Sequence, residues 1–199
     1  MGQRLVVTIT NKEKEIAKLY YHWSAYSVSA LREVKKIVDC IYDHEDETEK
    51  ELLLKLIRFC EANGGGIDGK EEEYKYIQSL YPDQEFVKEG YSRNNGLIAL
   101  SENGMKDLQD WSEGDINIDL DEDMIYNGVY NYYATLEEYN EECLECNDDF
   151  EPLSIIDVPN IDYDLSAISV EELDGLINEL MEINDYVVRN GYEIFQLIA

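Results

Sequence analysis

The chain has 199 residues and a formal net charge of −29 at pH 7. Apolar residues make up 44% of it and tyrosine occurs 16 times, which is typical of a folded protein and not of a disordered acidic tail. Nucleic acid and anionic lipid are themselves polyanions, so neither is expected as a direct partner.

The sequence also gives expectations about location. It contains no apolar run of about 18 residues, so no membrane span is predicted. The N-terminus lacks the apolar core of a secretory signal. The four cysteines (Cys40, Cys60, Cys143 and Cys146) are scattered, as reduced thiols are in cytoplasmic proteins. We therefore expect a cytoplasmic protein.

The first half of the chain predicts a hairpin followed by helices. Two β-rich runs, 5–9 and 16–23, flank a polar turn. Ser27 or Ser29 then begins a helix. Its predicted apolar face consists of Leu31, Val34, Ile37, Val38 and Ile41. Thr48 and Glu51 form a capping box for a second helix. That helix is expected to bury Leu52, Leu53, Leu56, Ile57 and Cys60.

Glycines end the second predicted helix, and shorter elements follow. Residues 63–66 read Asn-Gly-Gly-Gly, which predicts a helix end and a flexible hinge. A short charged helix is expected over 70–81, a strand over 96–100, and a helix from Ser101 to about Trp111.

The second half shows both strand and helix periodicity. Ile116, Ile118 and Leu120 alternate with acidic or polar residues, which predicts a strand with one buried face, paired with a strand over 124–133. Thr135 and Glu138 form a capping box for a short helix to about Cys146, and residues 147–166 are expected to be irregular.

The last predicted elements are a long helix and a strand. Ser169 and Glu172 form a capping box for the helix, and a final strand is expected over 192–198. The helix core stripe is predicted to be Leu173, Leu176, Ile177, Leu180, Asn184, Val187 and Val188. The fold class is therefore α+β, with antiparallel strands and several amphipathic helices. We expect two lobes, 1–106 and 107–199, or a single domain containing both.

Catalytic and metal sites are poorly supported. His22 and His44 fit packed or solvent-facing histidines better than a general base. Cys143 and Cys146 would give a zinc ion only two ligands. Residues 64–66 lack the Lys-Ser/Thr of a phosphate loop. A calcium loop starting at Asp119 would place Met124 and Tyr130 where Gly and Glu are needed. We expect no catalytic residue, no metal and no cofactor.

The negative charge is strongly asymmetric. Residues 107–199 hold 26 Asp and Glu but one basic residue, Arg189, whereas residues 1–106 hold 19 acids and 15 bases. Protein surfaces normally mix charges of both signs. A field of this kind attracts and steers a basic partner, with a strength that falls as salt rises.

The spacing of the acids is compatible with that of nucleic-acid phosphates. Alternate residues of a strand lie about 6.7 Å apart, close to two phosphate steps of DNA. Asp119, Asp121 and Asp123 are expected to share one strand face. The predicted partner-binding residues are Asp115, Asp119, Asp121, Glu122, Asp123, Glu137, Glu138, Glu141, Glu142, Glu145, Asp148, Asp149 and Glu151.

Residues 115–123, 137–145 and 148–151, in a half so poor in basic residues, resemble the acidic DNA-mimic inhibitors made by phages and mobile elements. Those are anti-restriction and anti-CRISPR proteins. The resemblance implies a phage-encoded inhibitor, not an enzyme. Its carboxylates would block the nucleic-acid groove of a basic partner, a Cas effector or another defence nuclease, in the cytoplasm of a bacterial host.

Two other functions remain open. A sponge or hydrolase for signalling nucleotides would need a cationic pocket, and only the first half could build one. The candidate residues for that pocket are Arg4, Lys18, His22, Arg32 and Arg93. An acidic phage accessory protein, with a charge that only confers solubility, is the other alternative.

Overall fold

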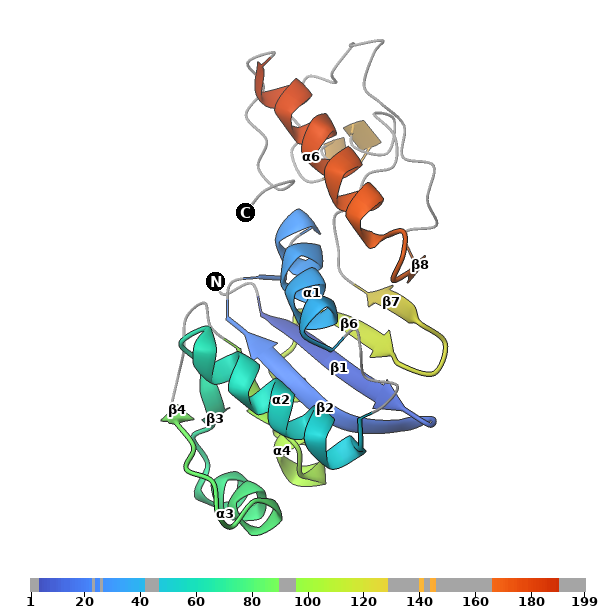
Figure 1. Cartoon of the computed structure of the whole chain (residues 1–199). Helices are drawn as coiled ribbons and strands as arrows, with labels where there is room; N and C mark the ends of the chain where they lie inside the picture. Colours follow the sequence, from blue (N-terminus) through green and yellow to red (C-terminus); the bar gives the residue numbers. More distant parts are fainter. Residues whose placement is uncertain are drawn as a thin grey trace.

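A computed structural model describes residues 4–22, 24–25, 27–41, 47–89, 96–128, 140–141, 144–145 and 166–189 of the chain. Its centre is an eight-stranded mixed sheet in the order β4-β3-β5-β2-β1-β6-β7-β8 (Figure 1). Helices α1 (Ser27–Ile41) and α2 (Glu49–Ala62) lie against one face of this sheet. The predicted α+β class is confirmed, and most strand pairs are antiparallel.

The hairpin predicted at the start of the chain is confirmed. Strand β1 (Leu5–Asn11) pairs antiparallel with β2 (Lys14–Tyr21) through a two-residue turn. Both turn residues, Lys12 and Glu13, have positive φ angles, 53° and 60°. Two left-handed residues in a row are characteristic of a type I′ turn, whose twist matches that of the flanking strands.

On one side of the hairpin, β1 pairs in parallel with β6 (Gly114–Asp119). Strand β6 then pairs antiparallel with β7 (Met124–Gly128), and β7 with β8 (Ala167–Ser169). On the other side, β2 pairs antiparallel with β5 (Leu97–Ala99), which is parallel to β3 (Gly66–Asp68). Strand β4 (Lys88–Glu89) completes the sheet, parallel to β3.

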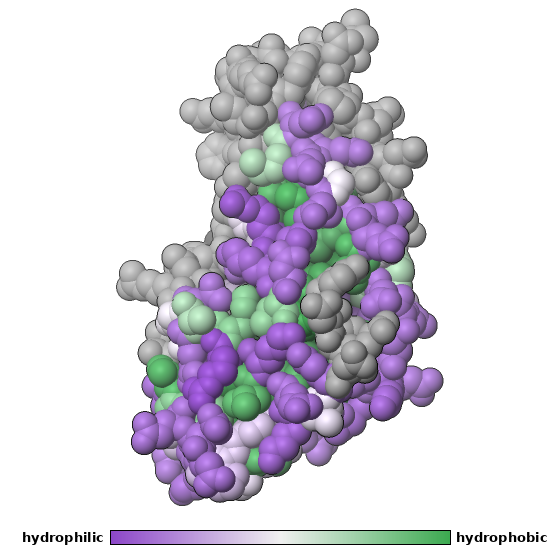
Figure 2. Space-filling model, in the orientation of Figure 1, coloured by the Kyte–Doolittle hydropathy of each residue, from purple (hydrophilic) through white to green (hydrophobic). Residues whose placement is uncertain are grey.

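The main core lies between the sheet and three helices, α1, α2 and α6 (Leu173–Arg189). All the residues predicted for the apolar faces of the first two helices are buried. Leu173, Leu176 and Leu180 of α6 are buried as well, and α6 packs against α1. The capping box of Thr48 and Glu51 is confirmed, with the Thr48 N–H donating to the Glu51 carboxylate at 2.9 Å. Figure 2 shows hydrophilic residues over the helix side, with hydrophobic residues visible between the helices.

A smaller core lies on the opposite face of the sheet. There α4 (Glu102–Gln109) covers Val6, Tyr20, Leu97 and Ala99 with its Leu108 side chain. As predicted, the Ser101 side chain accepts a hydrogen bond from the Gly104 N–H at 3.0 Å, so Ser101 caps α4. Helix α3 (Glu71–Leu80) confirms the short charged helix predicted over 70–81, whereas the strand β3 before it was not predicted.

The structure corrects the predicted glycine hinge. Gly66 belongs to β3, and Gly65 packs directly on Gly96. A Cβ atom on Gly65 would lie 2.0 Å from the Gly96 carbonyl oxygen. Gly65 therefore allows a close approach of two backbones because it carries no side chain, whereas a Cβ atom on Gly96 would meet the Tyr21 ring at 3.1 Å.

Two further boundaries differ from the prediction. The predicted contact of Ser169 with Glu172 is present, since the Ser169 hydroxyl donates to the Glu172 carboxylate at 2.6 Å, but Ser169 belongs to β8 and the helix begins only at Leu173, after a turn over 170–172. The predicted strand over residues 116–121 ends at Asp119, and residues 120–123 form a turn. The boundary expected after residue 106 falls inside α4, and β1 and β6, one from each half, are hydrogen-bonded neighbours in the same sheet.

Several predictions lie outside the described residues. These are the last strand over 192–198, the irregular segment over 147–165, and most of the helix expected over 135–146. The four described residues of that last range, 140–141 and 144–145, are helical.

Candidate functional site

Two distant segments meet at the end of the sheet near the hairpin tip. Met124 of β7 is paired with Ser169 of β8, and the Val170 N–H donates to the Asp123 carbonyl oxygen at 2.9 Å. This pairing places the β6–β7 turn beside the start of α6. We call the acidic residues of these two segments the anionic edge: Asp119, Asp121, Glu122, Asp123, Glu171, Glu172 and Asp174. All of them are exposed except Asp119, which is half-buried.

Backbone hydrogen bonds fix the turn that carries four of these carboxylates. The Leu120 N–H donates to the Thr10 carbonyl oxygen at 3.0 Å, and the Lys12 N–H donates to the Asp121 carboxylate. The Asp119 carboxylate accepts the N–H groups of Asp121 and Glu122, at 2.9 Å and 3.3 Å. The turn is thus tied to its neighbouring hairpin and holds its carboxylates on a defined backbone.

Few cations neutralise the acids of the second half. Within the described ranges, acids beyond residue 106 form three ion pairs: Lys70–Asp107, Arg4–Glu113 at 2.7 Å and Lys35–Asp174 at 3.6 Å. The four carboxylates of the β6–β7 turn form none there. The Tyr126 hydroxyl donates to the Glu122 carboxylate, and this hydrogen bond raises the pKa of Tyr126. Among the acids of the anionic edge, only Asp174 therefore has an ion-pair partner within the described ranges, Lys35.

The predicted partner-binding residues fall into three groups. Asp119, Asp121, Glu122 and Asp123 lie together on the edge, but the expectation that three of them share a strand face is wrong, because β6 ends at Asp119. Glu141 and Glu145 are exposed on described helical residues. The remaining acids lie outside the described residues: Glu137, Glu138, Glu142, Asp148, Asp149 and Glu151.

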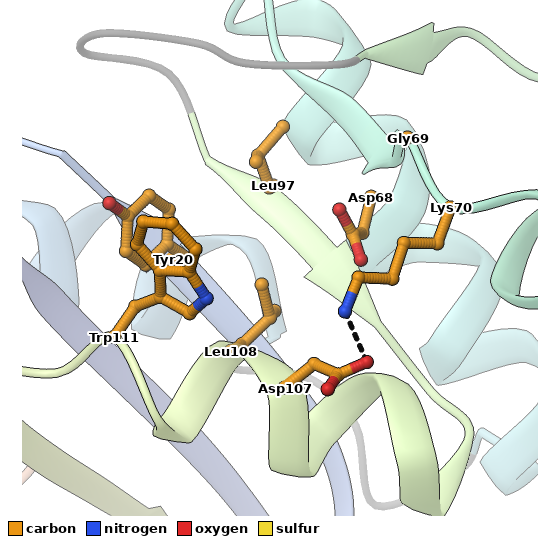
Figure 3. Close-up of a pocket in the computed structure, with 8 residues that line it drawn as sticks. All are labelled: Tyr20, Asp68, Gly69, Lys70, Leu97, Asp107, Leu108 and Trp111. Atoms are coloured by element: carbon orange, nitrogen blue, oxygen red, sulfur yellow. Dashed lines mark ion pairs between the residues drawn. The ribbon is translucent and has the colours of Figure 1, made fainter.

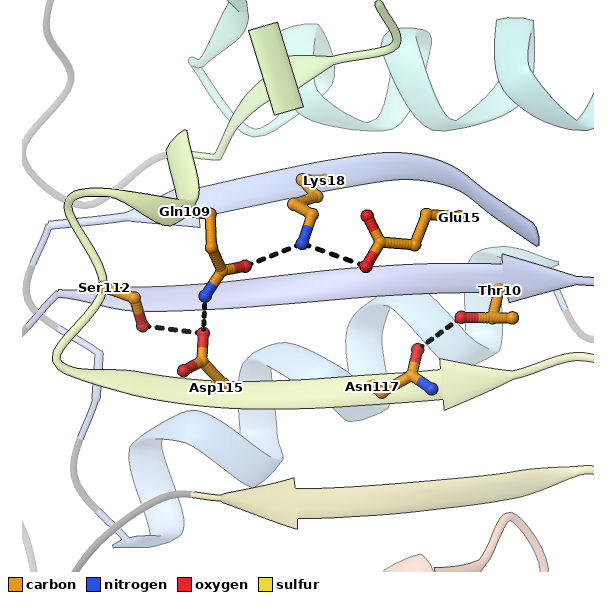
Figure 4. Close-up of polar contacts among 7 residues, drawn as sticks. All are labelled: Thr10, Glu15, Lys18, Gln109, Ser112, Asp115 and Asn117. Carbon is orange, nitrogen blue, oxygen red and sulfur yellow. Dashed lines mark hydrogen bonds and ion pairs between the residues drawn. The ribbon is translucent and has the colours of Figure 1, made fainter. Parts of the chain in front are cut away.

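Asp115 stands apart, near the start of β6 on the smaller-core face of the sheet. Its carboxylate accepts hydrogen bonds from Gln109 and from Ser112, both at 2.7 Å (Figure 4). The Gln109 carbonyl oxygen in turn accepts from Lys18 at 2.7 Å, and Lys18 forms an ion pair with Glu15 at 3.3 Å. Lys18 is only 6% exposed, so this network supplies the partners that a buried ammonium needs.

A pocket that the sequence did not predict lies between α4 and the end of β3 (Figure 3). It has a volume of about 270 Å³. Its lining consists of Tyr20, Asp68, Gly69, Lys70, Leu97, Asp107, Leu108 and Trp111. In Figure 3, Tyr20 and Trp111 form one side, the charged residues form the other, and Leu97 and Leu108 lie between them. At the charged side, the Lys70 ammonium pairs with the Asp107 carboxylate.

Asp68 is the unusual residue of this pocket. It is 8% exposed, and its Oδ2 atom has no hydrogen-bond donor among the described residues. Desolvation raises the pKa of Asp68, opposed by the positive charge of Lys70 and reinforced by the negative charges of Glu73 and Asp107. The sequence signal for Asp68 is weak, a single acid followed by Gly69 in a loop before a helix.

The cationic residues considered for a nucleotide pocket are dispersed. Arg4 pairs with Glu113, Lys18 belongs to the network around Gln109, and Arg32 is exposed on α1. His22 lies 2.8 Å from the Tyr20 hydroxyl through its Nδ1 atom. Arg93 and His44 lie outside the described residues.

The same described ranges offer no support for metal or membrane chemistry. They hold no group of three or more His, Cys, Asp or Glu residues placed to bind a metal ion. No helix in them is both long and apolar enough to cross a bilayer. Cys60 is a free, fully buried thiol whose pKa is raised by desolvation.

Comparisons with protein-family models, with curated proteins and with solved structures find no match to this chain.

Proposed function

We propose that the protein is a phage-encoded, non-enzymatic inhibitor of a bacterial defence nuclease, a Cas effector in the first instance. Its carboxylates occupy the Arg- and Lys-lined groove of the nuclease and exclude DNA. The protein acts in the cytoplasm of the bacterial host. The observation that carries the proposal is the anionic edge, where Asp121, Glu122 and Asp123 are exposed, form no ion pair with a described residue, and are held on a hydrogen-bonded turn.

Rigidity matters for this function. A flexible acidic tail loses conformational entropy when it binds, which reduces its affinity. Carboxylates that are already fixed lose little conformational entropy on binding. A groove that binds a polyanion provides the matching positive charge. The fixed turn over residues 120–123 therefore supports mimicry more than a role in solubility alone. The dispersal of Arg4, Lys18 and Arg32 weighs against a nucleotide sponge or hydrolase.

Competition with DNA tests the proposal. Fluorescently labelled duplex DNA is bound to each of a panel of guide-loaded Cas effectors and restriction nucleases, and the protein is titrated in. We expect displacement of DNA from at least one nuclease, with no cleavage or modification of the DNA. If none of the cationic nucleases releases its DNA at low salt, the proposal fails.

A matched pair of variants tests the anionic edge itself. D121N/E122Q/D123N removes three charges from the edge, and E72Q/D83N/E85Q removes three from exposed acids elsewhere. Both variants make the net charge less negative by the same three carboxylates. We expect the edge variant to weaken inhibition at least tenfold and the control variant to change it less than threefold, since one to three desolvated charge pairs are lost only in the first.

A further inference from the structure

The pocket between α4 and β3 combines a polar group with aromatic and apolar surface. Trp111 is 47% exposed, which is unusual for so large an apolar side chain, whereas Tyr20 beside it is 3% exposed. Leu97 and Leu108 line the floor between these rings and Asp68 (Figure 3). Pockets of this type, apolar with one or two convergent polar groups, are the usual form of a ligand site.

Asp68 supplies the polar group. A buried carboxylate oxygen without a donor destabilises the folded protein, because its lost hydration is not replaced. Lys70 lies close by, but its ammonium is paired with Asp107. An unsatisfied buried polar atom in a native protein needs an explanation, and a bound ligand that donates the missing hydrogen bond is one.

The charge and shape of the pocket select the class of ligand. The charged side chains that line it are two carboxylates and one ammonium, in a protein of net charge −29. The Arg4 guanidinium, which is not part of the lining, lies 5.9 Å from the centre of the Trp111 ring. An anion would be repelled, and an uncharged apolar ligand would leave the Oδ2 atom of Asp68 without a donor. A planar cation can interact with both sides of the pocket. The aromatic faces on one side attract cations, and a guanidinium presents parallel N–H groups to the carboxylate on the other side.

We propose that this pocket binds a guanidinium group, with Asp68 accepting its N–H groups and Trp111 contacting its planar face. The occupant is an arginine side chain of a protein partner. The assignment of the guanidinium to a partner's arginine rests on the proposed function, since a nucleic-acid groove is rich in arginine. The binding of a guanidinium group by the pocket does not depend on the proposed function.

The pocket and the anionic edge lie at different ends of the sheet. Tyr20 of the pocket is paired with Val6, near the start of β1, whereas the edge contacts Thr10 and Lys12 at the other end of that strand. Four residues of strand separate Val6 from Thr10, about 13 Å. Variants at one site can therefore be made without touching the other.

Nuclear magnetic resonance provides the test. In a W23F background, Trp111 is the only tryptophan, because the chain has two. The indole N–H of Trp111 and the amide of Gly69 are followed while N-acetyl-arginine methylamide is added. We expect saturable shifts of both signals. The citrulline analogue, which has the same shape without the charge, is expected to bind at least tenfold more weakly.

Variants of the pocket check the assignment. D68N and W111L are each expected to weaken arginine binding at least tenfold, read from the Gly69 amide, while E72Q leaves it unchanged. Circular dichroism confirms that each variant is folded. Equal binding of the citrulline analogue, or unchanged binding by folded D68N, would overturn the guanidinium site. Tighter binding of free agmatine than of the capped amino acid would overturn the assignment to a partner's side chain.

These results are separable from those of the proposed function. D121N/E122Q/D123N should bind the capped arginine as wild type does, because the pocket is intact. If no nuclease releases DNA but the arginine titration saturates, the inhibitor proposal fails and the pocket stands. If D68N inhibits the nuclease as strongly as wild type, the partner's arginine does not enter this pocket.

Discussion

The backbone N–H of Lys12, at the tip of the β1–β2 hairpin, donates a hydrogen bond to the Asp121 carboxylate in the β6–β7 turn. The tips of two hairpins are thereby joined at the same end of the sheet. Lys12 and Glu13 adopt left-handed backbone conformations, with φ angles of 53° and 60°. The geometry of the anionic edge thus depends in part on the β1–β2 hairpin. The residue types at its turn, Lys and Glu, do not favour the left-handed backbone conformation that the turn requires.

The first prediction concerns that turn. The double substitution K12N/E13G introduces the sequence that type I′ turns prefer, and it keeps the backbone N–H that Asp121 accepts. A left-handed conformation costs a non-glycine residue about 1–2 kcal/mol. We expect the free energy of unfolding, measured by urea denaturation, to rise by about 1 kcal/mol. An unchanged or lower stability would contradict the assigned turn.

The second prediction concerns Gly65. An alanine Cβ would lie 2.0 Å from the Gly96 carbonyl oxygen, so G65A must push β3 away from the segment that leads into β5. We expect G65A to lower the free energy of unfolding by about 3 kcal/mol or more, as other severe backbone clashes do. Gly64 serves as the comparison, since its φ of 81° alone makes G64A cost about 1 kcal/mol. Equal losses of stability for G65A and G64A in thermal unfolding experiments would argue against the close approach of Gly65 to Gly96.

The third prediction concerns Glu73, which is 2% exposed. Its carboxylate accepts the N–H groups of Leu100 at 2.7 Å and Ser101 at 3.1 Å, and also the Ser101 hydroxyl. E73A leaves these donors buried without an acceptor. We expect it to destabilise the protein by about 2–4 kcal/mol in urea denaturation, in contrast to less than about 0.5 kcal/mol for E72A on the exposed side of α3.

The fourth prediction follows from the raised pKa of Asp68, which desolvation causes. The folded state holds the Asp68 proton more tightly than the unfolded state, whose pKa is about 3.9. Ionisation of Asp68 therefore costs stability as the pH rises through the pKa of the folded state. Below about pH 3.9 the side chain is protonated in both states, and this penalty is absent.

D68N removes the penalty at every pH. We expect it to be more stable than wild type at pH 7, by about 0.5–1 kcal/mol, with a difference that shrinks as the pH is lowered toward 3.9. Thermal unfolding at a series of pH values measures this. A variant that is less stable than wild type at pH 7 would mean that the Oδ2 atom of Asp68 has a donor in the folded protein.

Local signals in the sequence predicted the elements that depend on local interactions. Helix α2 has a capping box at Thr48 and Glu51 and an apolar period that ends at Cys60, all within one segment. The β1–β2 hairpin is likewise a contact between neighbours along the chain. These features fold as predicted because their partners are a few residues away.

Non-local contacts were the part that the sequence did not reveal. The parallel pairing of β1 with β6 joins residues more than 100 positions apart, as in Leu5 and Gly114. Strands β3 and β8 have three residues each, too few for a visible alternation. Asp68 is a candidate only because the fold places it in one pocket with Leu97 and Leu108, which come from other elements. The excess of acids is visible in the sequence. Their grouping into the anionic edge depends on the pairing of β7 with β8, which the sequence did not predict.

The dependence of inhibition on salt tests the central claim most directly. The dissociation constant for the nuclease that releases DNA most readily is measured between low and physiological ionic strength for wild type, D121N/E122Q/D123N and the control E72Q/D83N/E85Q. The account predicts a steep loss of affinity with salt for wild type and the control, and a distinctly shallower slope for the edge variant. Identical slopes for all three proteins would contradict the claim that the anionic edge binds the groove.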